Sequence, residues 1–241
     1  MGDSATQDGA AEDQERLLAA VREARGDAAP FALASSAALI LLAVVSNVVP
    51  WQLLGHGLWW IWLVVAVPWV CLCAVLLLGL SKLAAHDHRR EIVIGLLTVV
   101  WGFTVAGVVV MLVSLLYKSG ADITGRQLLL SAAVVLFTNG VAFGLAFWEL
   151  DCGGPVARAL STDPRLPDFQ FPQDENPQLA RKEWAPRLPD YLYLSLTNTM
   201  AFSPTDTQPL TRSAKRLMAA ESILSGVTIL LVAARAVNIL D

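Results

Sequence analysis

Charged residues are scarce in this sequence. Asp, Glu, Lys and Arg make up 16% of the 241 residues, whereas apolar residues make up 55%. A soluble domain typically carries about 25% charged residues, so this composition excludes a mostly water-facing surface. The apolar residues also gather in long runs, which a soluble core does not require. The composition therefore indicates a chain that lies largely within a lipid bilayer, which we expect to be its main partner.

Cysteine and histidine are equally sparse, at three residues each. Cys71 and Cys73 would project from different faces of a helix, so they cannot hold one metal ion together. His86 and His88 stand in a basic turn without further ligands to complete a metal site. The zinc-protease, Walker and Gly-x-Ser-x-Gly motifs are also missing. We therefore expect no metal, no cofactor, no enzyme activity and no nucleic-acid partner.

What the sequence does hold is a series of long apolar segments. About 20 apolar residues in a helix cross the roughly 30 Å hydrocarbon core of a bilayer. We predict an all-α membrane protein with five transmembrane helices, over residues 31–49, 57–80, 92–117, 127–150 and 214–240. Pro68 predicts a kink in the second of these helices. The first four helices form a transmembrane region, 31–150, which follows a polar N-terminal tail, 1–30. The tail could contain a short helix over 13–24 or be flexible throughout, and both interpretations stay open.

The fifth segment is the least apolar of the five, because Glu221 and Arg235 interrupt it. Burying either charge near the membrane centre costs about 2.5–3.5 kcal/mol on insertion scales. Charged side chains near helix ends can instead reach toward the interface. Such a helix suits a bundle interior or a wet cavity better than a lipid-facing position.

Two unusual segments lie between the fourth and fifth predicted spans. Residues 151–189 form a long polar connection with seven prolines, a composition that opposes a hidden helix. Residues 190–202 are apolar and aromatic but too short to cross, and Ser203 and Pro204 follow at once. Non-helical backbone at membrane depth must be shielded by protein or line a cavity. We therefore predict that the last unit, 190–241, contains a re-entrant half-helix before the fifth span.

Basic residues predict the orientation, because they concentrate on the cytoplasmic side of a membrane protein. With the N-terminus inside, fourteen of the 17 Lys and Arg residues face the cytoplasm. The three that face outward are Lys118, Arg126 and Arg235. Tyr191 and Tyr193 fall at the cytoplasmic boundary of the membrane. They could belong to an aromatic belt there or pack between helices, and both interpretations stay open. We place the N-terminus in the cytoplasm and the C-terminus outside.

The fourth predicted span holds two pairs of candidate residues. Gly140 and Gly144 lie four apart on one helix face and would let a second helix approach closely. Packing within the bundle and packing between copies of the chain are both open for this pair. Glu149 and Asp151 close the same span, either as a cation-binding pair at a cavity mouth or as a polar helix end.

The half-helix begins Asp190-Tyr-Leu-Tyr193-Leu-Ser195, and Asp206 and Pro209 follow it after a short loop. In these residues the segment resembles the pore module of two-helix potassium channels. The glycine-rich filter of that family is replaced by Ala201, Phe202, Ser203, Pro204 and Thr205. Potassium selectivity needs carbonyl rings whose backbone conformations favour glycine and are closed to proline. The resemblance implies a pore-loop-like unit without potassium selectivity.

The channel module would put its loop outside the cell, whereas the distribution of basic residues puts it inside. We base the predicted orientation on the basic residues, because their distribution uses information from every segment of the chain.

A wider stretch, from the fourth span to the end, contains Trp148-Glu-Leu-Asp151 with Gly153-Gly-Pro155, then Phe202-Ser-Pro-Thr-Asp206 and Ala233-Ala-Arg-Ala-Val-Asn-Ile-Leu240. In these motifs it resembles an uncharacterised family of predicted bacterial multi-pass membrane proteins. The resemblance implies a bacterial plasma (inner) membrane protein and brings no established function.

We expect a structural or accessory membrane protein. The alternative is an oligomeric ion channel, in which ions pass the pore-loop-like segment 201–206 and Glu221 stands near a cavity or mouth. Asn198, Thr199 and Glu221 separate these hypotheses. A pore would turn the three side chains toward a wet axis, whereas a scaffold would satisfy them by hydrogen bonds within one chain.

Overall fold

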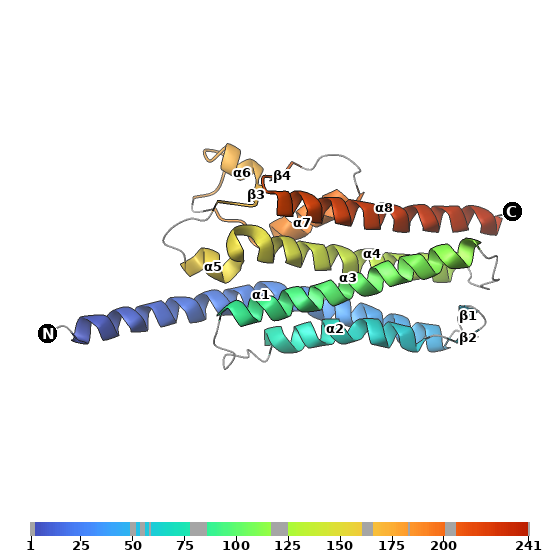
Figure 1. Ribbon diagram of the computed structural model, residues 1–241, viewed down its shortest axis with the longest axis horizontal. Coiled ribbons are helices and arrows are strands. Elements are labelled where there is room, and N and C mark those ends of the chain that lie inside the picture. The colour runs from blue at the N-terminus through green and yellow to red at the C-terminus, as the bar shows by residue number, and fades with distance from the viewer. Residues whose placement is uncertain are drawn as a thin grey trace.

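The computed structural model describes residues 3–48, 52–53, 56–57, 59–77, 86–116, 125–160, 166–182, 184–200 and 206–240. Five long helices make up most of it: α1 (Asp3–Val48), α2 (Trp60–Leu77), α3 (His86–Leu116), α4 (Gly125–Leu150) and α8 (Arg212–Leu240). They lie side by side as an elongated bundle (Figure 1). The predicted all-α class is confirmed.

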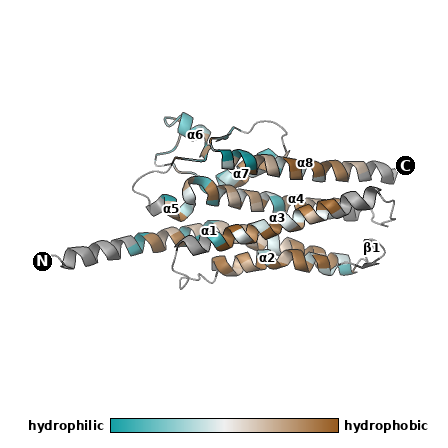
Figure 2. Ribbon diagram, viewed as in Figure 1, coloured by the Kyte–Doolittle hydropathy of each residue, from teal (hydrophilic) through white to brown (hydrophobic). Residues whose placement is uncertain are grey.

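Four helices are long and apolar enough to cross a membrane, judged over the described part of the chain. These candidate spans are Gln14–Val48, Glu91–Val109, Leu129–Arg158 and Arg212–Ala234, and each contains a long apolar window. The second predicted span is a shorter apolar helix, Trp60–Leu76, with Pro68 inside it. It begins later than predicted because Gly57 belongs to a strand. Figure 2 shows apolar residues along the helices and polar ones at the start of α8.

The remaining described elements are short. Two antiparallel strand pairs join β1 (Gln52–Leu53) to β2 (His56–Gly57) and β3 (Phe169–Gln170) to β4 (Gln208–Pro209). The short helices are η1 (Asp151–Gly153), α5 (Pro155–Leu160), α6 (Pro172–Glu175) and α7 (Leu188–Met200).

The connection 151–189 contains helical turns, contrary to the prediction from its prolines. Pro155 and Pro172 are the first residues of α5 and α6. Proline is well tolerated at the first helical position, because its missing N–H would have no partner there and its φ angle is already helical. These prolines therefore begin helices in this connection.

Helix α1 begins far earlier than the predicted boundary at Pro30, which lies inside it. Proline normally costs a helix interior about 3 kcal/mol, so a compensating interaction is needed. Ala24, Ala28 and Ala32 recur every four residues and are all buried, and α1 contacts α2, α4 and α5. Tertiary packing supplies most helix stability in proteins, and this stripe of small side chains allows close packing across the proline.

Helix α7 is positioned by its neighbours and by the strands on either side of it. It contacts α4, α8 and α1. Phe169 of β3 lies opposite Pro209 of β4, and the Leu210 N–H donates to the Asp168 carbonyl at 2.8 Å. The chain segments before and after α7 therefore return to the same place, at the end of the bundle where α8 begins (Figure 1).

Candidate functional site

Helix α7 carries two faces of opposite character. Its buried polar residues recur at the spacing of one helix face and are Tyr191, Ser195, Asn198 and Thr199. Its most exposed side chains are Tyr193, Leu196 and Met200. Leu188 and Leu194 are buried as well, so α7 buries polar and apolar groups together, whereas a surface helix of a soluble protein turns a mainly apolar stripe to the core. The buried polar face must find hydrogen-bond partners within the bundle.

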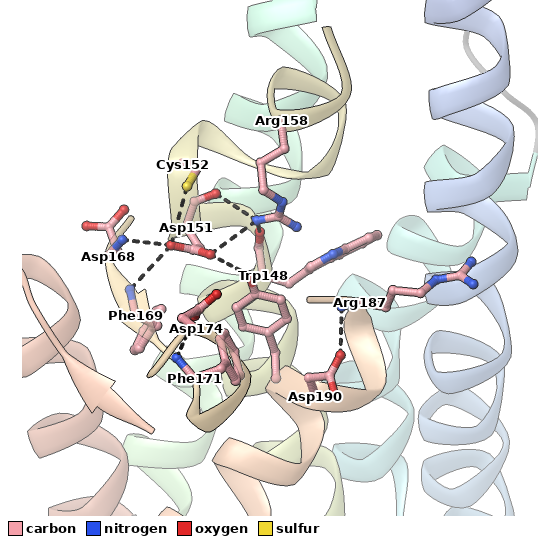
Figure 3. Close-up of polar contacts among 11 residues, drawn as sticks. Trp148, Asp151, Cys152, Arg158, Asp168, Phe169, Phe171, Asp174, Arg187 and Asp190 are labelled. Carbon is pink, nitrogen blue, oxygen red and sulfur yellow. Dashed lines mark hydrogen bonds and ion pairs between the residues drawn. The ribbon is translucent and has the colours of Figure 1, made fainter. Parts of the chain in front are cut away.

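Asp151, directly after α4, is the first partner of that face. Its carboxylate accepts hydrogen bonds from the backbone N–H groups of Asp168 (2.7 Å) and Phe169 (3.3 Å). The Tyr191 hydroxyl donates to the same carboxylate at 2.5 Å. The Arg158 guanidinium lies 3.6 Å from it in a partly buried ion pair. Figure 3 shows Asp168, Phe169 and Arg158 converging on Asp151, which is therefore a fully engaged buried carboxylate.

Arg158 also closes the end of α4. Its Nη1 donates to the carbonyls of Trp148 (3.3 Å) and Asp151 (2.8 Å), which are among the acceptors that a helix end leaves without partners. Its guanidinium carbon lies 5.4 Å from the centre of the Tyr191 ring. Burial raises the pKa of the Tyr191 phenol, so the phenol keeps its proton and remains the donor to Asp151.

A left-handed turn carries the chain from α4 to α5. Cys152 has a φ of 53°, and Gly153 and Gly154 have φ values of 84° and 99°. Such angles are uncommon for residues with side chains and easy for glycine. A Cβ atom added at Gly154 would lie 2.9 Å from Oε2 of Glu149. Gly153 and Gly154 both adopt a positive φ that favours glycine, and at Gly154 a side chain would also lack space.

Aromatic rings pack around the same site. The Tyr191 ring centre lies 6.2 Å from that of Phe169 and 5.2 Å from that of Phe171. Phe147 packs on Phe169 at 5.3 Å, and Trp184 packs on Phe171 at 5.8 Å. All four pairs are tilted edge to face, a favourable geometry for aromatic rings. Asp151, beside these rings, is only 2% exposed.

Glu221 of α8 is the second partner of the α7 polar face, and it is fully buried (0% exposed). Asn198 Nδ2 donates to its Oε2 at 2.6 Å, and the Thr199 hydroxyl donates to its Oε1 at 3.2 Å. The Ser195 hydroxyl makes a close hydrogen bond with Oε1 and also lies 2.8 Å from the Gly140 carbonyl oxygen of α4. The hydrogen bonds that Glu221 makes in the described part of the chain all involve uncharged side chains.

The network around Glu221 extends into all three helices. Ser222 of α8 donates to Asn198 Oδ1 at 3.0 Å. Thr199 Oγ1 lies 3.4 Å from Ser225 Oγ, which accepts from Asn139 Nδ2 of α4 at 3.4 Å. Asn139 Oδ1 is buried and has no hydrogen-bond partner among the described residues. Side chains from α4, α7 and α8 are therefore linked through one set of hydroxyl, amide and carboxyl groups.

The structure brings some of the predicted site residues together. Asn198, Thr199 and Glu221, which the sequence associated with a cavity or mouth, lie in the one buried network. Asp151 lies among donors and a guanidinium, which fits a polar helix end, and Glu149 is buried close by.

The predicted pore-loop-like segment is only partly described. Asp206 is exposed in a bend before β4. Ala201, Phe202, Ser203, Pro204 and Thr205 lie outside the described residues.

The glycine pair of α4 lies against α7. A Cβ atom at Gly144 would be 2.6 Å from Leu192 Cδ2 and 3.2 Å from Leu192 Cα, which is too close to be accommodated without movement. A Cβ atom at Gly140 would make an ordinary 3.7 Å contact with Ser195. The close approach is therefore made at Gly144, between helices of one chain.

Sequence reasoning did not identify three of these partners. It matched Ser195 to a channel half-helix, left Tyr191 open between an aromatic belt at the membrane boundary and helix packing, and counted Arg158 only as a charge. Tyr191 is fully buried, whereas Tyr193 is 59% exposed, so packing accounts for Tyr191. One signal was available in the sequence: polar residues recur on one face of a short apolar helix. Such residues need hydrogen-bond partners when buried, but the sequence does not identify those partners.

No protein-family model, curated protein or solved structure matches this chain. Among the residues that were described, no group of three or more His, Cys, Asp or Glu side chains could hold a metal ion. The most distinctive feature of the described residues is the pair of buried carboxyl groups, on Asp151 and Glu221, that hold α7.

Proposed function

We propose that this chain is a multi-pass integral protein of a bacterial plasma membrane with its N-terminus in the cytoplasm. The four long apolar helices support membrane placement. Helix α2 has 18 residues and would rise about 27 Å, so it can serve as a fifth span across a core of roughly 30 Å. The N-terminus and the connection 151–189, which are rich in basic residues, lie at one end of the bundle, and the C-terminus lies at the other (Figure 1).

Helix α7 acts in this proposal as a re-entrant half-helix that enters and leaves by the cytoplasmic face. Its 13 residues rise about 20 Å, too short to cross the hydrocarbon core. The pairing of β3 with β4 holds the two flanks of α7 together, which supports entry and exit on one side. The resemblance of this segment to a channel pore module supports the same arrangement.

The role that the geometry supports best is structural or accessory: a closed, non-conducting pore-loop-like unit. One observation carries this proposal. Asn198, Thr199 and Glu221 are satisfied by hydrogen bonds within a single chain, as expected of a scaffold. A conducting path would instead need such groups to face water or permeating ions.

An oligomeric, non-potassium-selective ion channel is the second candidate. The exposed apolar stripe of Tyr193, Leu196 and Met200 on α7 supports it. In a single chain this stripe faces outward, and in an oligomer it would supply a contact between copies around a central path. Asp206, at the end of the loop after α7, is exposed and would then be accessible to cations.

Ion flux through the purified protein in liposomes distinguishes the two candidates. We would measure K⁺, Na⁺, Cl⁻ and H⁺ flux for the wild type and for Asp206→Ala, with an added ionophore as the positive control. A scaffold predicts no flux above that of protein-free liposomes from either protein. Wild-type flux that Asp206→Ala alters would overturn the scaffold and establish the channel.

A further inference from the structure

The hydrogen atoms around Glu221 can be counted. A serine hydroxyl has one proton to donate. Ser195 Oγ nevertheless contacts two acceptors, Oε1 of Glu221 and the carbonyl oxygen of Gly140. If Ser195 donates to the carboxylate, its oxygen faces the Gly140 carbonyl oxygen at 2.8 Å with no hydrogen between them, which is repulsive. One more proton is needed to satisfy both contacts.

The neighbouring donors cannot supply that proton. Asn198 uses both amide protons, one on Glu221 Oε2 at 2.6 Å and one on the Met218 carbonyl at 3.0 Å. Thr199 has a single hydroxyl proton, directed either to Glu221 at 3.2 Å or to Ser225 at 3.4 Å. Neither side chain lies between Ser195 and its two acceptors. The missing hydrogen must therefore sit on the carboxyl group itself.

We propose that Glu221 is a proton-binding site in which Oε1 carries a proton and donates it to Ser195 Oγ. Ser195 then donates its own proton to the Gly140 carbonyl, and Asn198 donates to Oε2, the remaining carbonyl oxygen of the acid. The Thr199 hydroxyl donates to Oε1, and the Ser225 hydroxyl donates to Thr199. Every contact in this part of the network then has one hydrogen between its two heavy atoms.

A proton fits this site better than a metal cation. Cations such as Ca²⁺ and Mg²⁺ need several oxygen ligands at about 2.0–2.6 Å around one centre. Asn198 presents an N–H group to Glu221, and that group would repel a cation. The carboxyl group is 0% exposed, and an ionised carboxylate without a charged partner is costly in such a place. The neutral acid removes that cost.

The bound proton gives the site a structural consequence. The neutral acid joins α8 to α7, and through Ser195 it joins both helices to α4. Loss of the proton would leave a buried charge and one unsatisfied contact, so we expect α7 to loosen from α8 or to admit water. The inference rests on the proposed function in one respect, since the bilayer around α8 keeps bulk water away from the carboxyl group.

Infrared spectroscopy of the purified protein in lipid nanodiscs at neutral pH tests the proposal. A protonated carboxyl group has a carbonyl stretching band that a carboxylate lacks. We expect the wild-type spectrum to contain one such band that Glu221→Gln removes. The matched control, Asp206→Asn, changes an exposed carboxyl group and should leave the band in place. A wild-type spectrum in which Glu221→Gln removes no band would overturn the proposal.

A second variant keeps the test decisive if Glu221→Gln does not fold. Ser195→Ala removes the acceptor of the proposed O–H bond, so the carbonyl band should remain and shift to higher frequency. An unshifted band in folded Ser195→Ala protein would contradict the proposed hydrogen bond. The outcome is independent of ion flux, because a silent protein can contain a protonated Glu221 and a conducting one can contain an ionised Glu221.

Discussion

The Tyr191 hydroxyl lies 2.5 Å from the Asp151 carboxylate and joins the first turn of α7 to the end of α4 across 40 residues of sequence. Four residues further along α7, Ser195 contacts Glu221 of α8. Helix α7 is thus held on one face by two buried carboxyl groups from different helices. The opposite face makes no comparable polar contacts among the described residues and is largely exposed.

Removing the hydroxyl of Tyr191 tests the first of these attachments. Tyr191→Phe keeps the aromatic packing but deprives the buried Asp151 carboxylate of one donor. We expect the free energy of unfolding to fall by about 1–3 kcal/mol, measured by thermal or denaturant unfolding in detergent. The control is Tyr193→Phe, because Tyr193 is 59% exposed and should tolerate the loss. Equal stability of the two variants would contradict the role of Asp151 as an anchor.

Arg158 and Arg187, two arginines that pair with acids in the described part of the chain, should differ sharply in importance. Arg158 is only 17% exposed and pairs with Asp151, which is 2% exposed. Breaking a buried pair by removing one partner costs about 3–5 kcal/mol, so Arg158→Gln should destabilise the protein strongly.

Arg187 supplies the control for that experiment. It pairs with Glu23 at 2.7 Å and with Asp27 at 3.3 Å, but its side chain is 56% exposed. Exposed ion pairs contribute about 0–1 kcal/mol, so Arg187→Gln should change the unfolding free energy little. A larger loss from Arg187→Gln than from Arg158→Gln would show that the buried site does not dominate.

Gly144 should be the least replaceable glycine of α4. Alanine there would place a Cβ atom 2.6 Å from Leu192 Cδ2 and 3.2 Å from its Cα, so α7 would have to move. We expect Gly144→Ala to lose about 1–3 kcal/mol of stability, as overpacked cores do. Gly107→Ala in α3 is the control, because a Cβ atom there meets nothing within 4 Å, and it should be neutral or stabilising. Similar changes in both variants would exclude a special contact at Gly144.

The fold class could be predicted from the sequence, because long apolar runs are typical of transmembrane helices. The start of α1 did not follow, because Pro30 and the charged residues before it are strong local signals of a boundary. The buried stripe of Ala24, Ala28 and Ala32 instead favours a helix that continues through Pro30. Its effect depends on what packs against it, which a single sequence does not specify.

The acidic residues of the candidate site could be predicted from the sequence, but their hydrogen-bond partners could not. Glu221 stands out because a carboxyl group in an apolar helix needs partners. The partners Ser195, Asn198 and Thr199 lie 22 to 26 residues away in the chain. Their contacts require the chain to turn back between α7 and α8, where β4 pairs with β3. Two-residue strands leave almost no pattern in a sequence.

Paired cysteine labelling on both sides of α7 is the measurement that tests the central claim most directly. In a background lacking Cys71, Cys73 and Cys152, single cysteines would replace Leu179 before α7, Asp206 after it and Trp59 at the other end of the bundle. These three positions are exposed. Intact cells would be treated with a membrane-impermeant thiol reagent, and permeabilised cells would receive the same reagent.

A re-entrant α7 on the cytoplasmic side predicts one pattern. The cysteines at 179 and 206 should be protected in intact cells and labelled after permeabilisation, while the cysteine at 59 is labelled in both. Labelling of 206 from outside with protection of 179 would mean that α7 crosses the membrane. Labelling of both from outside would reverse the orientation.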